Sequence, residues 1–426
     1  MNEPNDMALN RRIMLLMSPA TYRAAAFTEA ARRLGIQAVA VVDMPEHLSD
    51  YWGQTHGIDF GNVAKATEQI SELARQEDIA AILSVDDSAT EIAALVNRVL
   101  GFPANSPDAA RAARDKFVMR SLLSSNGVRC PRFEDVPANS DPRIVAKQVT
   151  YPCVVKPRRL SGSRGVIRAN DEVEFVRAFV RLRAILEADG NDLMMTSILV
   201  EEYLPGDEVA VEGLLTDGRL RVLALFDKPD PLVGPFFEET IYVTPSRLSD
   251  AVQQAIATET AAAAAALGLV NGPIHAELRI NERGPWLLEI AGRSIGGLCS
   301  TILTFGAGMC LEEMILRHAV GMEIDTYDRS GDAVGVMMIP IPRTGILRSV
   351  EGIQDASDVP SITGVEITAK LNYPILPLPE GASYLGFIFA LGDTCAEVET
   401  ALRRAHAALR IRIDPALSMT QLPVAD

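Results

Sequence analysis

The chain has 426 residues, which is too long for one ordinary core and predicts two to four domains. Hydrophobic residues make up 48%, charged residues 23% and the formal net charge is −16, a composition typical of a soluble globular protein. The negative charge argues against broad binding to nucleic acid or an anionic membrane, because phosphate contacts need a basic surface.

The first 105 residues or so alternate between strand and helix patterns. Strands are predicted at 12–18, 37–43 and 79–85, and helices at 21–35 and 66–76. This alternation predicts a parallel α/β domain over residues 1–106. Its first turn, SPATY, contains no glycine, so the G-x-G-x-x-G loop of a dinucleotide-binding domain is not expected.

The pattern changes after this domain. One helix is predicted from Pro107 to Gly127, and from about residue 150 the turns LPGD, LTDGRL and NERG predict hairpins. An alanine-rich helix at 249–268 interrupts them. A further α+β unit is expected to close with the helix 395–410. The predicted domains are therefore 1–106, 107–328 and 329–426.

The cysteines and the N-terminus bear on the cellular compartment. The five cysteines show neither CxxC nor a Cys/His metal spacing, which favours free thiols in a reducing cytoplasm, with a catalytic thiol as the alternative. The start MNEPNDMALNRR lacks a signal pattern, and no apolar run reaches the ~18 residues that span a bilayer. We expect a cytoplasmic protein without a membrane partner.

The segment VVKPRRLSGSRGV, residues 154–166, gathers four cations in an acidic chain. Gly162 and Gly165 have no side chain to block an anion, so the backbone N–H groups of SGSRG can point at phosphate oxygens. Lys156 leaves the preceding strand where it would reach the same phosphates. The loop is not a Walker A motif. The alternative is an exposed basic turn.

The segment LVEEYLPGDEVAVEG, residues 199–213, offers groups suited to a nucleoside. A purine needs a backbone donor and acceptor together with an acceptor for its amine, and a ribose needs a carboxylate. Glu201, Tyr203, Leu204 and Glu208 could supply these. The alternative is a surface hairpin flanked by acidic residues.

The segment GPIHAELRINERGPWLLEIAGRSIGG, residues 272–297, is the most specific piece. Its alternation places His275, Glu277 and Arg279 on one face of a strand. With a three-residue turn centred on Arg283, Asn281 lies opposite Pro285, Arg279 opposite Leu287 and Glu277 opposite Glu289.

Two carboxylates directly across a ladder repel each other unless cations lie between them, and Mg²⁺ prefers oxygen ligands. Arg293 follows on the carboxylate side, placed for a developing negative charge. The alternative is a solvated hairpin face. His275 could be a general base, with a packed histidine as the alternative.

These motifs, in this order, resemble the ATP-grasp superfamily of carboxylate–amine ligases, and are most similar to the branch of bacterial L-amino acid ligases. The resemblance covers nearly the whole chain, from ARDKFVMRSLL through VVKP, SGSRGV, EEYL and EIAGR to SYLGFIFALGDTCAEVETALRRA. It implies an ATP-grasp fold with an N-terminal parallel α/β pre-grasp domain, a mobile nucleotide lobe at about 150–205 and a C-terminal α+β domain.

The resemblance also implies roles for residues. Lys116 and Lys156 would contact the nucleotide phosphates, and Ser161, Gly162, Ser163 and Gly165 would belong to the loop over them. Glu201, Tyr203 and Leu204 would form the adenine hinge, and Glu208 would hold the ribose. Glu277 and Glu289 would carry Mg²⁺, usually two ions, with Mn²⁺ as a substitute. Arg293 would steady the acyl phosphate. Ala291 stands where many members have an asparagine ligand.

The implied activity is ATP-dependent amide bond formation through an acyl phosphate, releasing ADP and phosphate, with amino acids as the acid and amine. The alternatives are a biotin carboxylase-like or purine-synthesis enzyme that activates bicarbonate or formate, a ligase of glycine with phosphoribosylamine, and a non-catalytic nucleotide-binding protein. The resemblance leaves a homodimer open and implies no nucleic-acid partner.

Overall fold

The computed structural model describes residues 11–49, 56–381 and 383–415, so most of the N-terminal segment discussed above lies outside the described residues. Within those ranges, no helix is both long enough and apolar enough to cross a membrane. The chain forms two compact units. The first comprises Met1–Glu134, Leu204–Asp227 and Thr244–Gly331, and the second Asp135–Tyr203, Lys228–Val243 and Asp332–Asp426.

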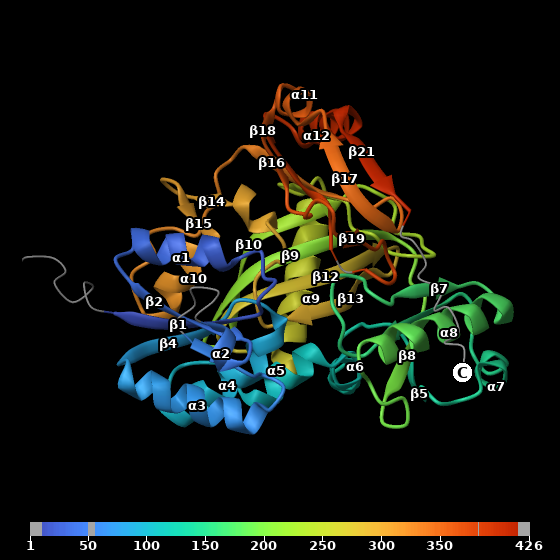
Figure 1. Cartoon of the computed structure of the whole chain (residues 1–426), viewed down its shortest axis with the longest axis horizontal. Helices are drawn as coiled ribbons and strands as arrows, with labels where there is room; N and C mark the ends of the chain where they lie inside the picture. The colour runs from blue at the N-terminus through green and yellow to red at the C-terminus, as the bar shows by residue number, and fades with distance from the viewer. Residues whose placement is uncertain (1–10, 50–55, 382, 416–426) are drawn as a thin grey trace, which may run out of the picture. The chain divides into compact units, whose positions relative to one another are not determined.

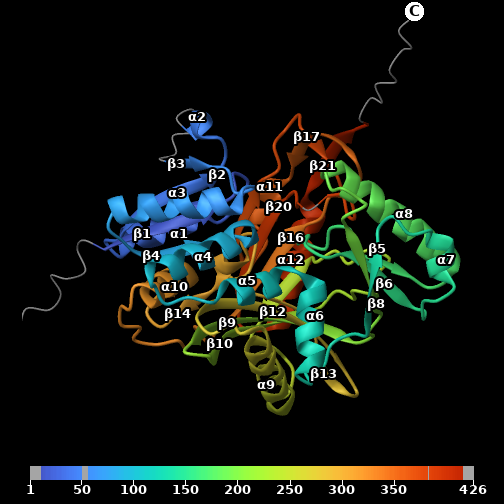
Figure 2. The same ribbon diagram turned by 90° about the horizontal axis from the view of Figure 1, so that it is seen from below.

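The first unit begins with the predicted parallel α/β arrangement. Its four-stranded sheet has the order β3-β2-β1-β4, and the pairs β1–β2, β1–β4 and β2–β3 are all parallel (Figures 1 and 2). The strands are β1 (Arg12–Met17), β2 (Gln37–Asp43), β3 (His56–Ile58) and β4 (Ile79–Ser84). The helices are α1 (Ala24–Arg33), α2 (Glu46–Ser49), α3 (Val63–Gln76) and α4 (Thr90–Leu100). Strand β3 was not predicted, because three residues carry no periodic signal.

The single helix predicted from Pro107 to Gly127 is wrong. The structure has two helices, α5 (Pro107–Arg114) and α6 (Lys116–Ser125). Asp115 separates them in an extended conformation, φ −103° and ψ 105°, and its side chain accepts hydrogen bonds from the N–H groups of Phe117 and Val118. A capping carboxylate satisfies donors that a continuous helix would have bonded internally, so the break costs little.

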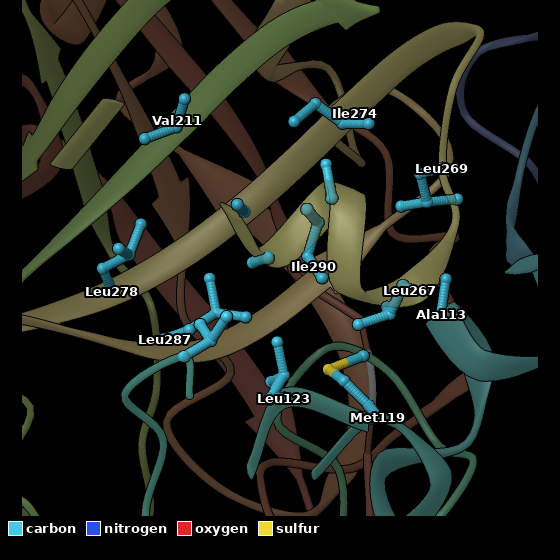
Figure 3. Close-up of a cluster of buried hydrophobic side chains, with 14 of the residues drawn as sticks. Ala113, Met119, Leu123, Val211, Leu267, Leu269, Ile274, Leu278, Leu287 and Ile290 are labelled. Atoms are coloured by element: carbon cyan, nitrogen blue, oxygen red, sulfur yellow. The ribbon is translucent and has the colours of Figure 1, made fainter. Parts of the chain in front are cut away.

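The remainder of the first unit is built on antiparallel strands in the order β13-β12-β9-β10. They are β9 (Asp207–Thr216), β10 (Arg219–Lys228), β12 (Gly272–Asn281) and β13 (Gly284–Ala291). Apolar side chains of β12 and β13 pack with α6 and with α9 (Asp250–Leu267), the predicted alanine-rich helix, in one core cluster (Figure 3). The unit also contains β14 (Thr304–Phe305), β15 (Met309–Cys310) and α10 (Leu311–Ala319).

The register between β12 and β13 differs from the prediction near the turn and agrees with it at the glutamates. The turn has two residues, so Asn281 pairs with Gly284 and Arg279 with Trp286. A bulge then inserts Leu288, whose carbonyl accepts a hydrogen bond from Arg120. The turn is one residue shorter than predicted and the bulge adds one residue that was not predicted. These two differences cancel, so Glu277 lies opposite Glu289 as predicted.

The second unit contains the segment predicted as the nucleotide lobe. A sheet of order β5-β8-β6-β7 carries α8 against it (Figure 2). Its elements are β5 (Phe133–Pro137), α7 (Pro142–Ala146), β6 (Cys153–Pro157), β7 (Ile167–Ala169), α8 (Glu172–Ala188) and β8 (Ser197–Glu202). Because β8 pairs with β6 whereas β9 pairs with β12, the hairpin predicted at LPGD is wrong.

The C-terminal part of the second unit is α+β, as predicted. One strand order is β11-β16-β20-β18 and another is β19-β17-β21, and α12 packs on β16 and β20. The strands are β11 (Ile241–Thr244), β16 (Ala333–Ile339), β17 (Gly345–Glu351), β18 (Ile362–Ile367), β19 (Pro374–Ile375), β20 (Gly386–Gly392) and β21 (Arg410–Asp414). The helices are α11 (Ile353–Ser357) and α12 (Cys395–Ala408).

Candidate active site

Two opposed carboxylates and a lysine lie together in the first unit. Glu277 and Glu289 are directly paired across β12 and β13, and their side chains are 22% and 31% exposed. Nζ of Lys116 lies 3.3 Å from Oε1 of Glu289, and this lysine is buried. Because Asp115 ends one helix and caps the next, Lys116 becomes the first residue of α6. The sequence-predicted residues Lys116, Glu277 and Glu289 are therefore brought together.

Arg293 follows β13 and forms an ion pair that the sequence reasoning missed. Its Nη2 donates to Oδ2 of Asp87 at 2.7 Å. Burial alone would raise the pKa of Asp87, but the charge of Arg293 outweighs it and holds that pKa below its ordinary value. Asp87 follows β4, and a signal existed, because parallel sheets bind ligands beyond the carboxyl ends of their strands.

His275 lies between two carboxylates. Its Nδ1 is 3.3 Å from Oε2 of Glu212, and its Nε2 is 3.6 Å from Oε1 of Glu277. Burial would lower the pKa of His275, but Glu212 and Glu277 raise it to about 9. Because both ring nitrogens face carboxylate oxygens, the arrangement favours a residue that orients Glu277 over a general base.

The backbone that follows Arg293 is held by hydrogen bonds from Arg23 and to Glu212. Arg23 donates to the hydroxyl of Ser294, to the carbonyl of Ile295 at 2.8 Å, and to Oε1 of Glu312 at 2.6 Å. The N–H of Ile295 donates to Glu212 at 2.9 Å. This network holds the backbone that carries Arg293 and therefore limits where its guanidinium can lie.

The residues expected to bind the nucleoside have protein partners here. Oε2 of Glu208 accepts from Nε of Arg279 at 3.0 Å, and both residues are buried. The same arginine donates to the carbonyl of Leu204 at 3.2 Å. In this structure Glu208 is therefore held by Arg279, which fixes the start of β9 next to Leu204.

The second unit contains the remaining predicted residues. Nζ of Lys156 lies 2.5 Å from Oε2 of Glu201, and both side chains are more than nine-tenths buried. Val154 pairs with Glu201 across β6 and β8, and Lys156 is two residues after Val154. Lys156 and Glu201 therefore lie on the same face of the sheet. Tyr203 has the guanidinium of Arg168 3.9 Å from its ring centre and stacks with Phe237.

The predicted phosphate loop connects β6 and β7. Gly162, Ser163 and Gly165 have φ values of 63°, 55° and 73°, in the left-handed region. A Cβ on Gly165 would be strained by the positive φ and would lie 2.8 Å from the end of the Leu182 side chain, which would have to shift. The guanidinium of Arg164 makes a two-pronged ion pair with Asp189 at 2.6 and 2.8 Å. This arginine, counted among the gathered cations, therefore anchors the loop.

The chemistry of the donor set fits a divalent cation of the Mg²⁺ type. Glu277 and Glu289 offer partly exposed carboxylate oxygens on one face, and like charges in direct opposition are destabilising unless compensated. Ala291, the position of the missing asparagine, is buried and offers no ligand. A bound Mg²⁺ would neutralise phosphate charge near these glutamates.

A cavity of about 90 Å³ lies within the first unit. Its lining includes Asp87, the partner of Arg293, and Ser294, together with Phe102 and Asn105. The cavity is of a size that suits part of a small organic molecule.

Two family models match separate parts of the chain, and one relative matches nearly all of it. Residues 149–302 match the ATP-grasp domain, and residues 337–414 match the L-amino acid ligase C-terminal domain 2. The chain is 23% identical over 422 residues to the uncharacterized protein y4rH of Sinorhizobium fredii, covering 95% of this chain and 84% of that protein. It is 30% identical over 213 residues to alanine–anticapsin ligase of Bacillus subtilis, which is 46% of this chain and 44% of that relative.

The fold is similar to that of the L-amino acid ligase from Bacillus licheniformis, with a TM-score of 0.83 and 24% identity. This similarity covers 95% of this chain and 99% of the other, and it establishes the ATP-grasp architecture. The C-terminal match, by contrast, is to a domain named for L-amino acid ligases. The sequence matches and the fold thus agree on an ATP-grasp architecture that ends in an L-amino acid ligase C-terminal domain.

Proposed function

We propose that this enzyme joins two L-amino acids in an ATP-dependent reaction. An oxygen of one substrate's carboxylate attacks the γ-phosphorus of ATP, and ADP leaves. The amine of the second substrate then attacks the carbonyl carbon, the bond from carbon to phosphate oxygen breaks, and the nitrogen loses a proton. The products are a dipeptide, ADP and phosphate.

The observation that carries this proposal is the cluster of opposite charges in the first unit. Lys116 lies next to the opposed pair Glu277 and Glu289, which suits the binding of a metal ion together with phosphate. Arg293 follows β13, the strand that carries Glu289. Such groups act by positioning and by neutralising charge, which is what phosphoryl transfer needs. Mg²⁺ bound to the glutamates would be required, and we infer two ions.

The role of Asp87 follows from its ion pair with Arg293. A substrate carboxylate competes with Asp87 for the guanidinium, and a substrate ammonium competes with Arg293 for the carboxylate. Both charged groups would then change partners when an amino acid enters, at the edge of the cavity that Asp87 lines. We therefore infer that Asp87 orients an amino acid substrate.

In the second unit, we propose that Lys156 and the loop of Ser161, Gly162, Ser163 and Gly165 hold the phosphates, with Glu201, Tyr203 and Leu204 at the adenine and Glu208 at the ribose. The division into domains 1–106, 107–328 and 329–426 belongs to the same proposal. A homodimer and a cytoplasmic location complete it, and the thiol state of all five cysteines suits a reducing compartment.

The test is phosphate release with Mg-ATP, screened across amino acids singly and in pairs, with mass spectrometry of the positive wells. Release that needs a particular pair, with a product lighter by one water than the sum of both, is the expected result. Glu277→Ala is the inactive control. Release that depends on bicarbonate or formate instead would contradict amino acid ligation, and ATP binding without turnover would leave a nucleotide-binding protein.

A further inference from the structure

The segment Pro377–Gly381 of the C-terminal part of the second unit contacts the phosphate loop within that same unit. The N–H of Gly165 donates to the carbonyl of Pro379 at 2.9 Å. Nε of Arg164 donates to the carbonyl of Glu380 at 2.7 Å. Two successive residues of the loop therefore bond to two successive carbonyls more than 200 positions later in the chain.

The side chain of Glu380 fastens this segment to α8. Both of its oxygens accept from Arg181, at 2.6 and 2.9 Å, and the guanidinium of Arg181 also lies 4.9 Å from the ring centre of Phe236. Hydrogen bonding to Arg181 lowers the pKa of Glu380, so the carboxylate is charged at neutral pH. A two-pronged pair fixes direction as well as distance.

The segment itself has a conformation that requires glycine. The N–H of Gly381 donates to the carbonyl of Pro377 at 2.9 Å, and a Cβ on Gly381 would lie 1.9 Å from the carbonyl oxygen of Leu376. This tight turn presents the carbonyls of Pro379 and Glu380 in the same direction, toward the loop.

These contacts divide the donors of the loop into two sets. Gly165 N–H and the Arg164 guanidinium are bonded to protein acceptors. In the part of the chain that the structure describes, the N–H groups of Gly162 and Ser163 donate to no protein acceptor. The anchored end thus holds in place the end whose donors remain for a ligand.

We propose that Glu380 is a positioning residue for ATP: through Arg181, and through the carbonyls of residues 379 and 380, it holds the glycine loop in the conformation that receives the nucleotide phosphates. The C-terminal region is thereby part of the nucleotide site without touching ATP. This inference rests on the assignment of residues 161–165 as the phosphate loop under the proposed function.

The experiment compares Glu380→Ala and Arg181→Gln with Asp414→Asn. The control breaks the pair between Arg348 and Asp414, which has a 2.8 Å contact and a similar exposure, 40% and 39% against 44% and 37% for Arg181 and Glu380. It lies in the same C-terminal region and does not contact the loop. If the pair of Arg181 and Glu380 contributed only to stability, its loss would affect the loop and ATP binding no more than loss of the pair of Arg348 and Asp414.

Two readouts are measured without amino acids. Hydrogen–deuterium exchange of the peptide covering 161–166 is expected to accelerate in both Glu380→Ala and Arg181→Gln, since the bond from Gly165 N–H loosens. ATP binding with Mg²⁺ is expected to weaken about two- to fivefold, the range for an exposed charge pair that acts through position. Binding of AMP, which lacks the outer phosphates, is expected to stay within about twofold, and the double variant should add little to either single change.

Unchanged exchange in the loop would overturn the proposal, because Glu380 would then not anchor it. Faster exchange with unchanged ATP binding would also overturn it, since the loop would be anchored but would not position phosphates. Equal weakening of ATP binding and AMP binding would also overturn the proposal, because the effect would not depend on the outer phosphates. None of these measurements involves peptide bond formation, so a failure to find an amino acid pair would be distinguishable from a failure of this inference.

Discussion

Glu277 and Glu289 face each other across two antiparallel strands, and Glu277→Gln removes one of the two charges. We expect ligase activity to fall by about 100-fold, the loss typical of an electrostatic group used in the transition state. The unfolding midpoint without Mg²⁺ should change little, because lost attraction to His275 opposes relieved repulsion from Glu289.

The control for this change is Glu282→Gln, at the exposed turn of the same hairpin. It should retain activity. The measurement is the rate of phosphate release, together with thermal unfolding with and without Mg²⁺. If the Glu277 variant kept the stabilisation that Mg²⁺ gives the parent enzyme, the metal assignment would be wrong.

The cysteines give a second prediction at the residue scale. Burial raises the pKa of Cys153 to about 12 and that of Cys310 to about 11, so at pH 8 their thiolate fractions are very small. We expect brief treatment of the native enzyme with iodoacetamide at pH 8 to leave these two thiols unlabelled and activity intact. Mass spectrometry locates the label, and loss of activity on labelling either thiol would restore the catalytic alternative.

At the scale of the element, the break between α5 and α6 decides where Lys116 lies. Asp115→Ala removes the cap, which costs about 1 kcal/mol and frees the first turn that carries this lysine. We expect activity to fall about tenfold beyond any effect of stability, and Asp115→Asn, which keeps a capping oxygen, to recover most of it.

Ser106→Ala is the matched control, since Ser106 caps α5 by accepting from the N–H of Ala109. It should lose a similar stability and keep its activity. Chemical denaturation and steady-state kinetics on the three variants separate the two effects. Equal activity in Asp115→Ala and Ser106→Ala would show that the break does not orient Lys116.

At the scale of the first unit, the ion pair of Arg23 and Glu312 links the residue before α1 to α10, and both side chains are 3% exposed. Burial would raise the pKa of Glu312, but the charge of Arg23 and the hydrogen bond from Ser300 hold it below its ordinary value of 4.5. A depressed pKa means that this contribution to stability is present above pH 4.5 and is lost as the pH falls further.

We therefore expect the unfolding midpoint of the parent enzyme to drop as the pH falls below 4.5, measured by calorimetry at a series of pH values. Glu312→Gln should lose about 3–5 kcal/mol at pH 7, because it leaves a buried guanidinium without its counter-charge, and should show a shallower acid drop. Glu351→Gln, which removes an exposed ion pair with Arg410, should change neither the stability at pH 7 nor the loss of stability in acid. An unchanged acid slope in Glu312→Gln would contradict this assignment.

The sequence by itself determined the local and periodic features. Strands β1, β2 and β4 followed from apolar runs, α9 and α12 from composition and helical spacing, and the shared face of His275, Glu277 and Arg279 from alternation along a strand. The ATP-grasp family was recognisable because short motifs keep their order along the chain. These features depend on neighbours within a few residues, which a sequence displays directly.

The tertiary structure alone decided the partners between distant segments. Nothing near Arg293 indicates Asp87, which is 206 residues earlier, and nothing near Arg164 indicates Glu380, which is 216 later. At the bulge, the carbonyl of Leu288 likewise accepts a hydrogen bond from Arg120 of α6, which lies 168 residues earlier. Such pairings form because a buried or partly buried polar group must find a partner in the packed chain, and the fold decides which one it meets.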